Sequence, residues 1–157
     1  MQASDLILLG LYPTALCAAI GTDLAFRKIP NLVVGSILVG FVALSFLMPL
    51  PDLSLRLLVA AAVTGLGFSL FAENVIGAGD AKLAGVLMLW LDPLQVPLFI
   101  AASGAIGAFL TLAARAERSG LNDGLGLLAC KHSLPYGVAL AGAGLMLLPF
   151  SSLLHGG

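Results

Sequence analysis

Charged residues are scarce in this chain of 157 residues: Asp, Glu, Lys and Arg together make up only 10% of it. Apolar residues make up 60%, and the mean hydropathy is +1.10, which lies outside the range of soluble globular domains. A net charge of −1 provides no basic surface of the kind that nucleic-acid binding requires. These scarcities indicate an integral membrane protein without a nucleic-acid partner.

Cysteine is also scarce, and an amino-terminal basic leader is missing. Two cysteines, Cys17 and Cys130, cannot form a four-thiolate zinc site or a disulfide framework. The two histidines, His132 and His155, fall on opposite sides of the membrane in the topology below and cannot share a metal, so we expect no metal and no cofactor. The first basic residue is Arg27, so we expect the first apolar run to be a retained membrane span, not a cleaved signal peptide.

Charges and prolines divide the chain into six apolar segments. We predict membrane-spanning helices at residues 6–22, 32–50, 53–72, 83–91, 93–114 and 134–154. In the second of these, Pro30 disfavours helix at Ile29, and Asn31 is a suitable cap for the helix that follows. The predicted fold is therefore an all-α, polytopic bundle of six transmembrane helices in one domain, residues 1–157.

The distribution of basic residues supports six spans and places the amino terminus in the periplasm. With this topology one basic residue, Arg56, lies outside and six lie inside: Arg27, Lys28, Lys82, Arg115, Arg118 and Lys131. A six-to-one excess is a strong positive-inside signal, and it disappears if the short fourth segment does not cross. We expect the backbone just before that segment, residues 77–80, to face protein or a wet cavity, because irregular backbone is not tolerated in lipid. Residues 115–133 are predicted to form a mobile or membrane-skimming loop.

Two aspartates occupy the same predicted face of the membrane, Asp23 after the first span and Asp80 at the start of the fourth. Carboxyls at this depth are costly and are functional candidates. Two carboxyls within a few ångströms share a proton, so that one can activate water while the other hydrogen-bonds a scissile carbonyl. Each also has a plainer interpretation: Asp80 as a helix cap, and Asp23 as an ion-pair partner four residues before Arg27.

The residues around both aspartates resemble the type IV prepilin peptidase family. Residues 23–31 read D-L-A-F-R-K-I-P-N and are similar to its D-x-x-x-R-x-I-P-N element, residues 77–83 read G-A-G-D-A-K-L and resemble G-x-G-D-x-K-L, and residues 135–137 read P-Y-G. The resemblance implies Asp23 and Asp80 as the catalytic residues. The other positions that match are Arg27, Pro30, Asn31, Gly77, Gly79, Lys82, Pro135, Tyr136 and Gly137.

The resemblance implies an aspartic endopeptidase of the bacterial inner membrane. Its substrates would be prepilins or pseudopilins, cut on the cytoplasmic side after a glycine between a basic leader and an apolar helix that lies in the lipid beside the enzyme. The small size resembles the minimal branch associated with Flp-type, tight-adherence pili. Larger relatives carry a cysteine-rich zinc domain and methylate the product, and the lack of that domain here argues against methylation.

Several supporting residues keep alternative roles from the sequence alone. Arg27 could orient Asp23 or serve as a topology determinant, and Tyr136 could hydrogen-bond near the carboxyls or lie in the interfacial aromatic belt. Lys82, two residues after Asp80, points away from it on a helix and is better placed to reach the interface. A proton-coupled transporter that uses Asp23 and Asp80 as a relay is the alternative function, and a non-catalytic assembly subunit is a third.

Overall fold

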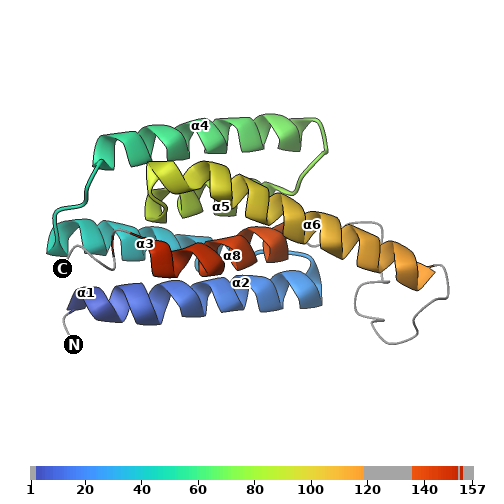
Figure 1. Cartoon of the computed structure of the whole chain (residues 1–157), viewed down its shortest axis with the longest axis horizontal. Coiled ribbons are helices and arrows are strands. Elements are labelled where there is room, and N and C mark those ends of the chain that lie inside the picture. Colours follow the sequence, from blue (N-terminus) through green and yellow to red (C-terminus); the bar gives the residue numbers. More distant parts are fainter. Residues whose placement is uncertain (1–2, 119–135, 152, 154–157) are drawn as a thin grey trace.

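The computed structural model describes residues 3–118, 136–151 and 153, with the backbone alone for residues 114–118. Every regular element within these ranges is helical (Figure 1). In chain order they are α1 Ala3–Asp5, the π-helix η1 Leu6–Leu11, α2 Tyr12–Phe26, α3 Asn31–Leu47, α4 Leu53–Ala72, α5 Ala78–Trp90, the 3₁₀ helix η2 Pro93–Gln95, α6 Val96–Arg118, α8 Tyr136–Leu147 and the 3₁₀ helix η3 Leu148–Phe150.

The first predicted span corresponds to α1, η1 and α2, which follow one another without a break. Pro13 lacks a backbone N–H and cannot make the ordinary helical bond one turn back, and the π-helical turn lies directly before it. The helix continues past the predicted end at residue 22 and stops at Phe26, where Arg27 adopts a left-handed conformation with φ of 54°. Asp23 is therefore part of the helix and does not follow it.

The next helices begin and end close to the predicted positions, with differences that prolines explain. The helix α3 ends at Leu47 and not at residue 50, because the chain becomes extended at Met48, directly before Pro49. Pro30 provides its N-cap, and Asn31 is its first helical residue, so the prediction of Asn31 as a capping side chain is wrong. The prediction for α4, residues 53–72, is confirmed.

The remaining helices also occupy predicted segments with shifted ends. Helix α5 begins five residues before the predicted start at residue 83, and α6 continues to Arg118 instead of ending at residue 114. The final helix α8 covers Tyr136–Leu147 and tightens into η3 around Pro149. The loop predicted at residues 115–133 is wrong for residues 115–118, which belong to α6. Its remainder, residues 119–133, lies outside the described residues, as do Pro135, Cys130, His132 and His155.

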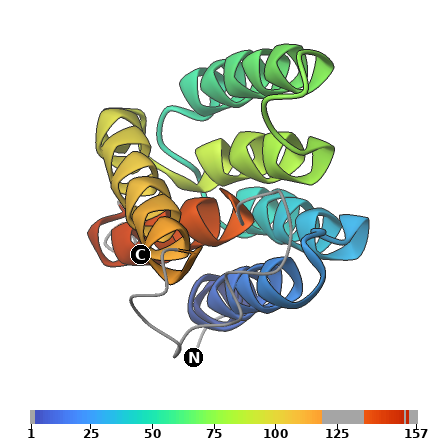
Figure 2. The ribbon, with the colours of Figure 1, turned by 90° about the vertical axis from the view of Figure 1, so that its right-hand side faces the viewer.

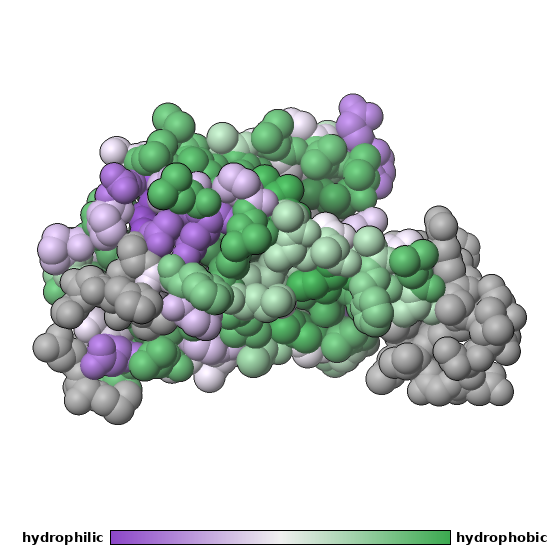
Figure 3. Space-filling model, in the orientation of Figure 1, coloured by the Kyte–Doolittle hydropathy of each residue, from purple (hydrophilic) through white to green (hydrophobic). Residues whose placement is uncertain are grey.

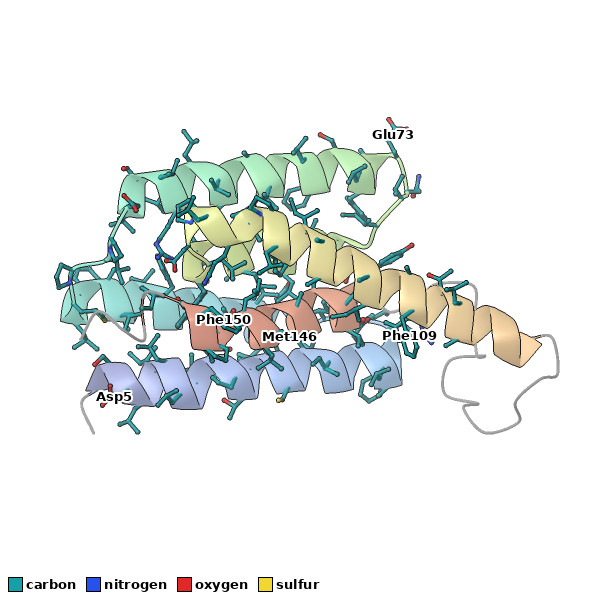
Figure 4. The ribbon with its side chains drawn as sticks, viewed as in Figure 1. Asp5, Glu73, Phe109, Met146 and Phe150 are labelled. Atoms are coloured by element: carbon teal, nitrogen blue, oxygen red, sulfur yellow. The ribbon has the colours of Figure 1, made fainter. Side chains whose placement is uncertain are left out.

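Successive helices run in opposite directions, so that their ends form two layers, one at each end of the bundle (at the left and the right of Figure 1). One layer contains the end of α2, the start of α3, the end of α4, the starts of α5 and α8, and the end of α6. Asp23 and Asp80 both belong to it, and we call it the aspartate end. Figure 4 shows Glu73 at this end and Asp5 at the opposite end.

The short helix α5 forms the centre of the bundle. It packs against α4, α3 and α8, and Figure 2, which looks onto the aspartate end, shows it between these three helices. Leu83, Leu87 and Trp90 are almost completely buried. The Trp90 ring stacks on Tyr12 of α2 with centroids 4.3 Å apart, and its indole N–H donates to the carbonyl of Ile37 in α3. Burial of aromatic rings of this size contributes strongly to packing.

The outer surface of the bundle is apolar. Large hydrophobic side chains on α3, α4 and α6 are exposed, among them Phe46, Leu58 and Phe109, and Figure 3 shows hydrophobic residues across the middle of the visible face with hydrophilic ones toward the two ends. Three described helices are long and apolar enough to cross a membrane: Leu6–Phe26, Leu53–Ala72 and Pro93–Ala113. Shorter apolar helices cover Asn31–Leu47 and Tyr136–Phe150. The chain is therefore an all-helical membrane protein.

Candidate active site

Asp23 is almost entirely buried near the end of α2, with 4% of its surface exposed. Its Oδ2 atom accepts a hydrogen bond of 3.0 Å from the backbone N–H of Val138, in the first turn of α8. The backbone approaches this closely because residue 137 is glycine: a Cβ atom there would lie 2.8 Å from Oδ2 and 2.7 Å from the Ile29 side chain. Gly137 therefore allows the α8 backbone to hold Asp23 in position through the Val138 N–H.

Asp80 lies in the first turn of α5, ahead of the apolar stretch 83–91 and outside the three candidate spans. Its side chain accepts a hydrogen bond of 3.3 Å from the Gly77 N–H, so the helix-capping interpretation holds, although Gly77 is the cap residue. Burial, and secondly the charge of Asp23, raises the pKa of Asp80 from 3.8 to about 6, against the opposing effect of the Gly77 N–H.

Both aspartates line one cavity of about 680 Å³ at the aspartate end. The cavity is partly open, and its other lining residues include Arg27, Lys28 and Tyr136. Asp23 and Asp80 are 57 positions apart in the sequence, and the structure brings them together because α2 ends where α5 begins. A partly open space of this size beside two carboxyls can admit an extended peptide and water.

Ile29 connects all three sequence elements that resemble the family. A Cβ atom at Gly79 would lie 3.3 Å from the Ile29 Cβ atom, and one at Gly137 would meet the end of the same side chain. Gly79 thus packs closely on Ile29. Both Gly77 and Gly79 line the cavity, and Gly77 also faces the Asp80 carboxyl. Our sequence interpretation gave Ile29 no role, although it is part of the I-P-N match; only the fold shows that its side chain touches both glycines.

Lys82 and Asn31 provide a second connection between these elements. The Lys82 ammonium group donates a hydrogen bond of 3.2 Å to the Asn31 side-chain oxygen, which joins the first turn of α5 to the first residue of α3. Lys82 was expected to point away from Asp80, and the helix does direct it to α3. Asn31 was expected to cap its own helix, and its side chain instead receives this bond.

The other motif residues surround the cavity. Arg27 and Tyr136 line it, and Tyr136 is 42% exposed at the start of α8. Pro30 holds the chain extended between α2 and α3, with ψ of 139°. Pro135 lies outside the described residues. The described part of the chain has no group of three or more His, Cys, Asp or Glu side chains that could hold a metal ion.

These features define a class of protein: a helical membrane protein with two interacting carboxyls in a cavity at one end of its bundle. A comparison with protein-family models matches residues 10–112 to the type IV leader peptidase family. The match covers about two thirds of the chain and includes the first two sequence elements, at 23–31 and 77–83. The chain belongs to this family and is a leader peptidase of the prepilin type.

Two further comparisons, with curated proteins and with solved structures, gave no match. The family assignment therefore rests on the family model and agrees with the resemblance in the sequence. It supports a prepilin as the substrate and a peptidase as the activity. It gives no support to the alternative interpretation as a proton-coupled transporter.

Proposed function

We propose that this protein is an aspartic endopeptidase in which Asp23 and Asp80 act as one catalytic pair. The observation that carries the proposal is that both carboxyls line one cavity, at which the pKa of Asp80 is raised to about 6. At a pH close to 6 such a pair holds a single shared proton. This is the protonation state that water-mediated peptide hydrolysis by two carboxyls requires.

In the proposed reaction the two carboxyls have different tasks. Asp80 begins protonated and donates its proton to the scissile carbonyl oxygen, while Asp23 begins as a carboxylate and takes a proton from the attacking water. The water oxygen bonds to the carbonyl carbon and forms a tetrahedral intermediate. Collapse of the intermediate breaks the C–N bond and re-forms the carbonyl, as one hydroxyl of the intermediate returns its proton to Asp80 and the proton on Asp23 moves to the leaving amine.

The proposed substrate is a prepilin or pseudopilin whose basic leader is removed on the cytoplasmic side of the bacterial inner membrane. The whole chain, residues 1–157, acts as one membrane domain with six spans, and residues 83–91 form the short fourth span, with Asp80 ahead of it. A reaction of two carboxyls and water needs no cofactor or metal.

The proposal is tested by reconstituting the protein in lipid vesicles with a prepilin and identifying the products by mass spectrometry. We expect two fragments, the basic leader ending in glycine and a mature pilin that begins with its apolar helix. A control prepilin in which isoleucine replaces this glycine should stay intact. Absence of cleavage, or cleavage at other bonds in both substrates, would contradict the proposed function.

A further inference from the structure

A second cavity, of about 470 Å³, lies between α5, α6 and α8. Its walls consist of apolar or small side chains from these three helices, with Asp80 at one end. We call it the α6 groove and define it by the residues of α6 that line it: Ile100, Ser103, Gly104, Gly107, Ala108 and Thr111. These positions extend over eleven residue steps, or about 16 Å of helix.

The α6 groove is continuous with the aspartate cavity. Ile76, Asp80 and Tyr136 line both of them, so the Asp80 carboxyl lies where the two spaces meet. A peptide that passes from one to the other would present its backbone to Asp80 at the junction. The first space contains polar and charged side chains, whereas the second is mainly apolar, so the two accept chemically different halves of one ligand.

The groove has free space along its α6 wall. A Cβ atom added at Gly104 would meet no heavy atom within 4 Å outside its own helix turn, and one at Gly107 would meet only the Ala139 side chain, at 3.9 Å. Helix α6 is also the most exposed of the three candidate spans, with 6% of its apolar window buried. The view onto the aspartate end shows α6 at the side of the bundle (Figure 2). The groove is therefore reached sideways, from the lipid.

We propose that the α6 groove binds the apolar helix of the prepilin, with its first turn next to Asp80. The inference rests on the proposed function and adds the place at which the enzyme holds the membrane part of its substrate. Small residues in one membrane helix allow a second helix to approach closely. In the α6 groove, the bond that precedes the prepilin helix would then lie at the Asp80 carboxyl.

The first test replaces glycine by leucine at two matched positions. Gly104 lies in the groove and Gly65 on α4; both are within helices, and an added Cβ meets nothing within 4 Å at either one. We expect Gly104→Leu to raise KM for the prepilin about tenfold, with kcat within about twofold, and Gly65→Leu to leave both unchanged. Equal kinetics of Gly104→Leu and wild type, or equal losses in both variants, would overturn the groove proposal.

A second test does not depend on activity. In a background with Cys17→Ser and Cys130→Ser, Ser103→Cys should form a disulfide with a cysteine placed in the first turns of the prepilin helix, whereas Ser69→Cys on α4 should not. Cross-linking at both serines or at neither would overturn the proposal. If wild-type protein fails to cleave the prepilin, the proposed function itself fails; if it cleaves and the Ser103 contact is missing, only the groove assignment fails.

Discussion

At the residue scale, the two aspartates have different surroundings although they line the same cavity. Asp23 is 4% exposed and accepts the Val138 N–H, whereas Asp80 is partly exposed at a helix start and accepts the Gly77 N–H. Environments that differ in this way give chemically identical groups different tasks. Asp23 depends on the α8 backbone for this hydrogen bond, and Gly137 allows that backbone to come close enough to make it.

Gly137→Ala should therefore lower the cleavage rate while the helices remain intact. The added Cβ atom would lie 2.8 Å from Asp23 Oδ2, so the carboxyl must move and lose its hydrogen bond. We expect a loss of at least about tenfold in kcat, because displacement of a catalytic group by about 1 Å costs as much or more. Gly142→Ala is the matched control on the same helix, since its Cβ would lie at an ordinary 3.5 Å from Ile106. Equal activity of the two variants would show that the Gly137 backbone does not position Asp23.

The cleavage rate should depend on pH in a bell shape. The pKa of Asp80 is raised to about 6, so its acid form is lost as the pH rises through this value, and the rate should fall on the alkaline side. At low pH the second carboxyl of the pair also becomes protonated, no base is left, and the rate should fall again. Initial rates from pH 4 to pH 9 measure both limbs. A rate that stays constant from pH 6 to pH 9 would contradict a shared proton.

The same pKa shift predicts a pH-dependent stability. A carboxyl whose pKa is higher in the folded than in the unfolded protein favours folding at low pH, and this contribution is lost as the pH rises through about 6. Asp80→Asn removes the ionised form, so it should raise Tm by about 2–4 °C at pH 8 and leave it unchanged at pH 4. Thermal unfolding in detergent at the two pH values measures this, and a lower Tm for the variant at pH 8 would contradict it.

At the element scale, the short helix α5 is fixed at both ends. Its start is joined to α3 through Lys82 and Asn31 and packs on Ile29. At its far end the buried Arg56 of α4 donates to the carbonyls of Leu89 and Leu91, at 3.2 Å and 2.8 Å, and pairs with Asp92. These bonds satisfy carbonyls that a helix end leaves without partners inside the protein. They explain how a helix of 13 residues can end in the interior of the bundle.

Arg56→Met should destabilise the protein strongly, because it leaves the Asp92 carboxylate and the α5 carbonyls without the guanidinium. We expect a loss of about 3 kcal/mol in the free energy of unfolding. The double variant Arg56→Met/Asp92→Asn should recover part of this loss, since it no longer contains an Asp92 carboxylate that has lost its ion pair with Arg56. Denaturant unfolding in mixed micelles measures all the variants. Equal stabilities of Arg56→Met and wild type would show that the pair is not needed to end α5.

The elements also show how far the sequence could predict the structure. Runs of apolar residues between prolines and charges located the six long helical segments of the described residues, because both signals act locally along the chain. The length of α2 past Asp23 and the contacts of Ile29, Asn31 and Arg56 could not be found in this way. Each of them depends on a partner at least 33 positions away or on how a neighbouring helix is placed, for example Lys82 opposite Asn31.

At the scale of the whole molecule, the alternating directions of the helices place Asp23 and Asp80 at one end of the bundle (Figure 1). The same alternation puts the two groups of basic residues that flank them, at 27–28 and at 82, at that end. In the proposed six-span topology this end would face the cytoplasm, and the amino terminus would face the periplasm. Asp5 and Glu73 mark the two ends (Figure 4).

Single cysteines at these two positions should therefore react from opposite sides of the membrane. In a background with Cys17→Ser and Cys130→Ser, Asp5→Cys should be labelled by an impermeant maleimide added to intact cells. Glu73→Cys should be labelled only after the inner membrane is opened. Labelling of both from the same side would contradict the six-span topology.

The central claim is that Asp23 and Asp80 form one catalytic unit. The most direct measurement is the prepilin cleavage rate of Asp23→Asn, Asp80→Asn and Glu73→Gln, each confirmed to be folded and inserted in vesicles. Glu73 is the matched control, an exposed acid at the same end of the bundle. We predict a loss of at least about a hundredfold for each asparagine variant and an unchanged rate for Glu73→Gln. Cleavage at the wild-type rate by either asparagine variant would contradict the account.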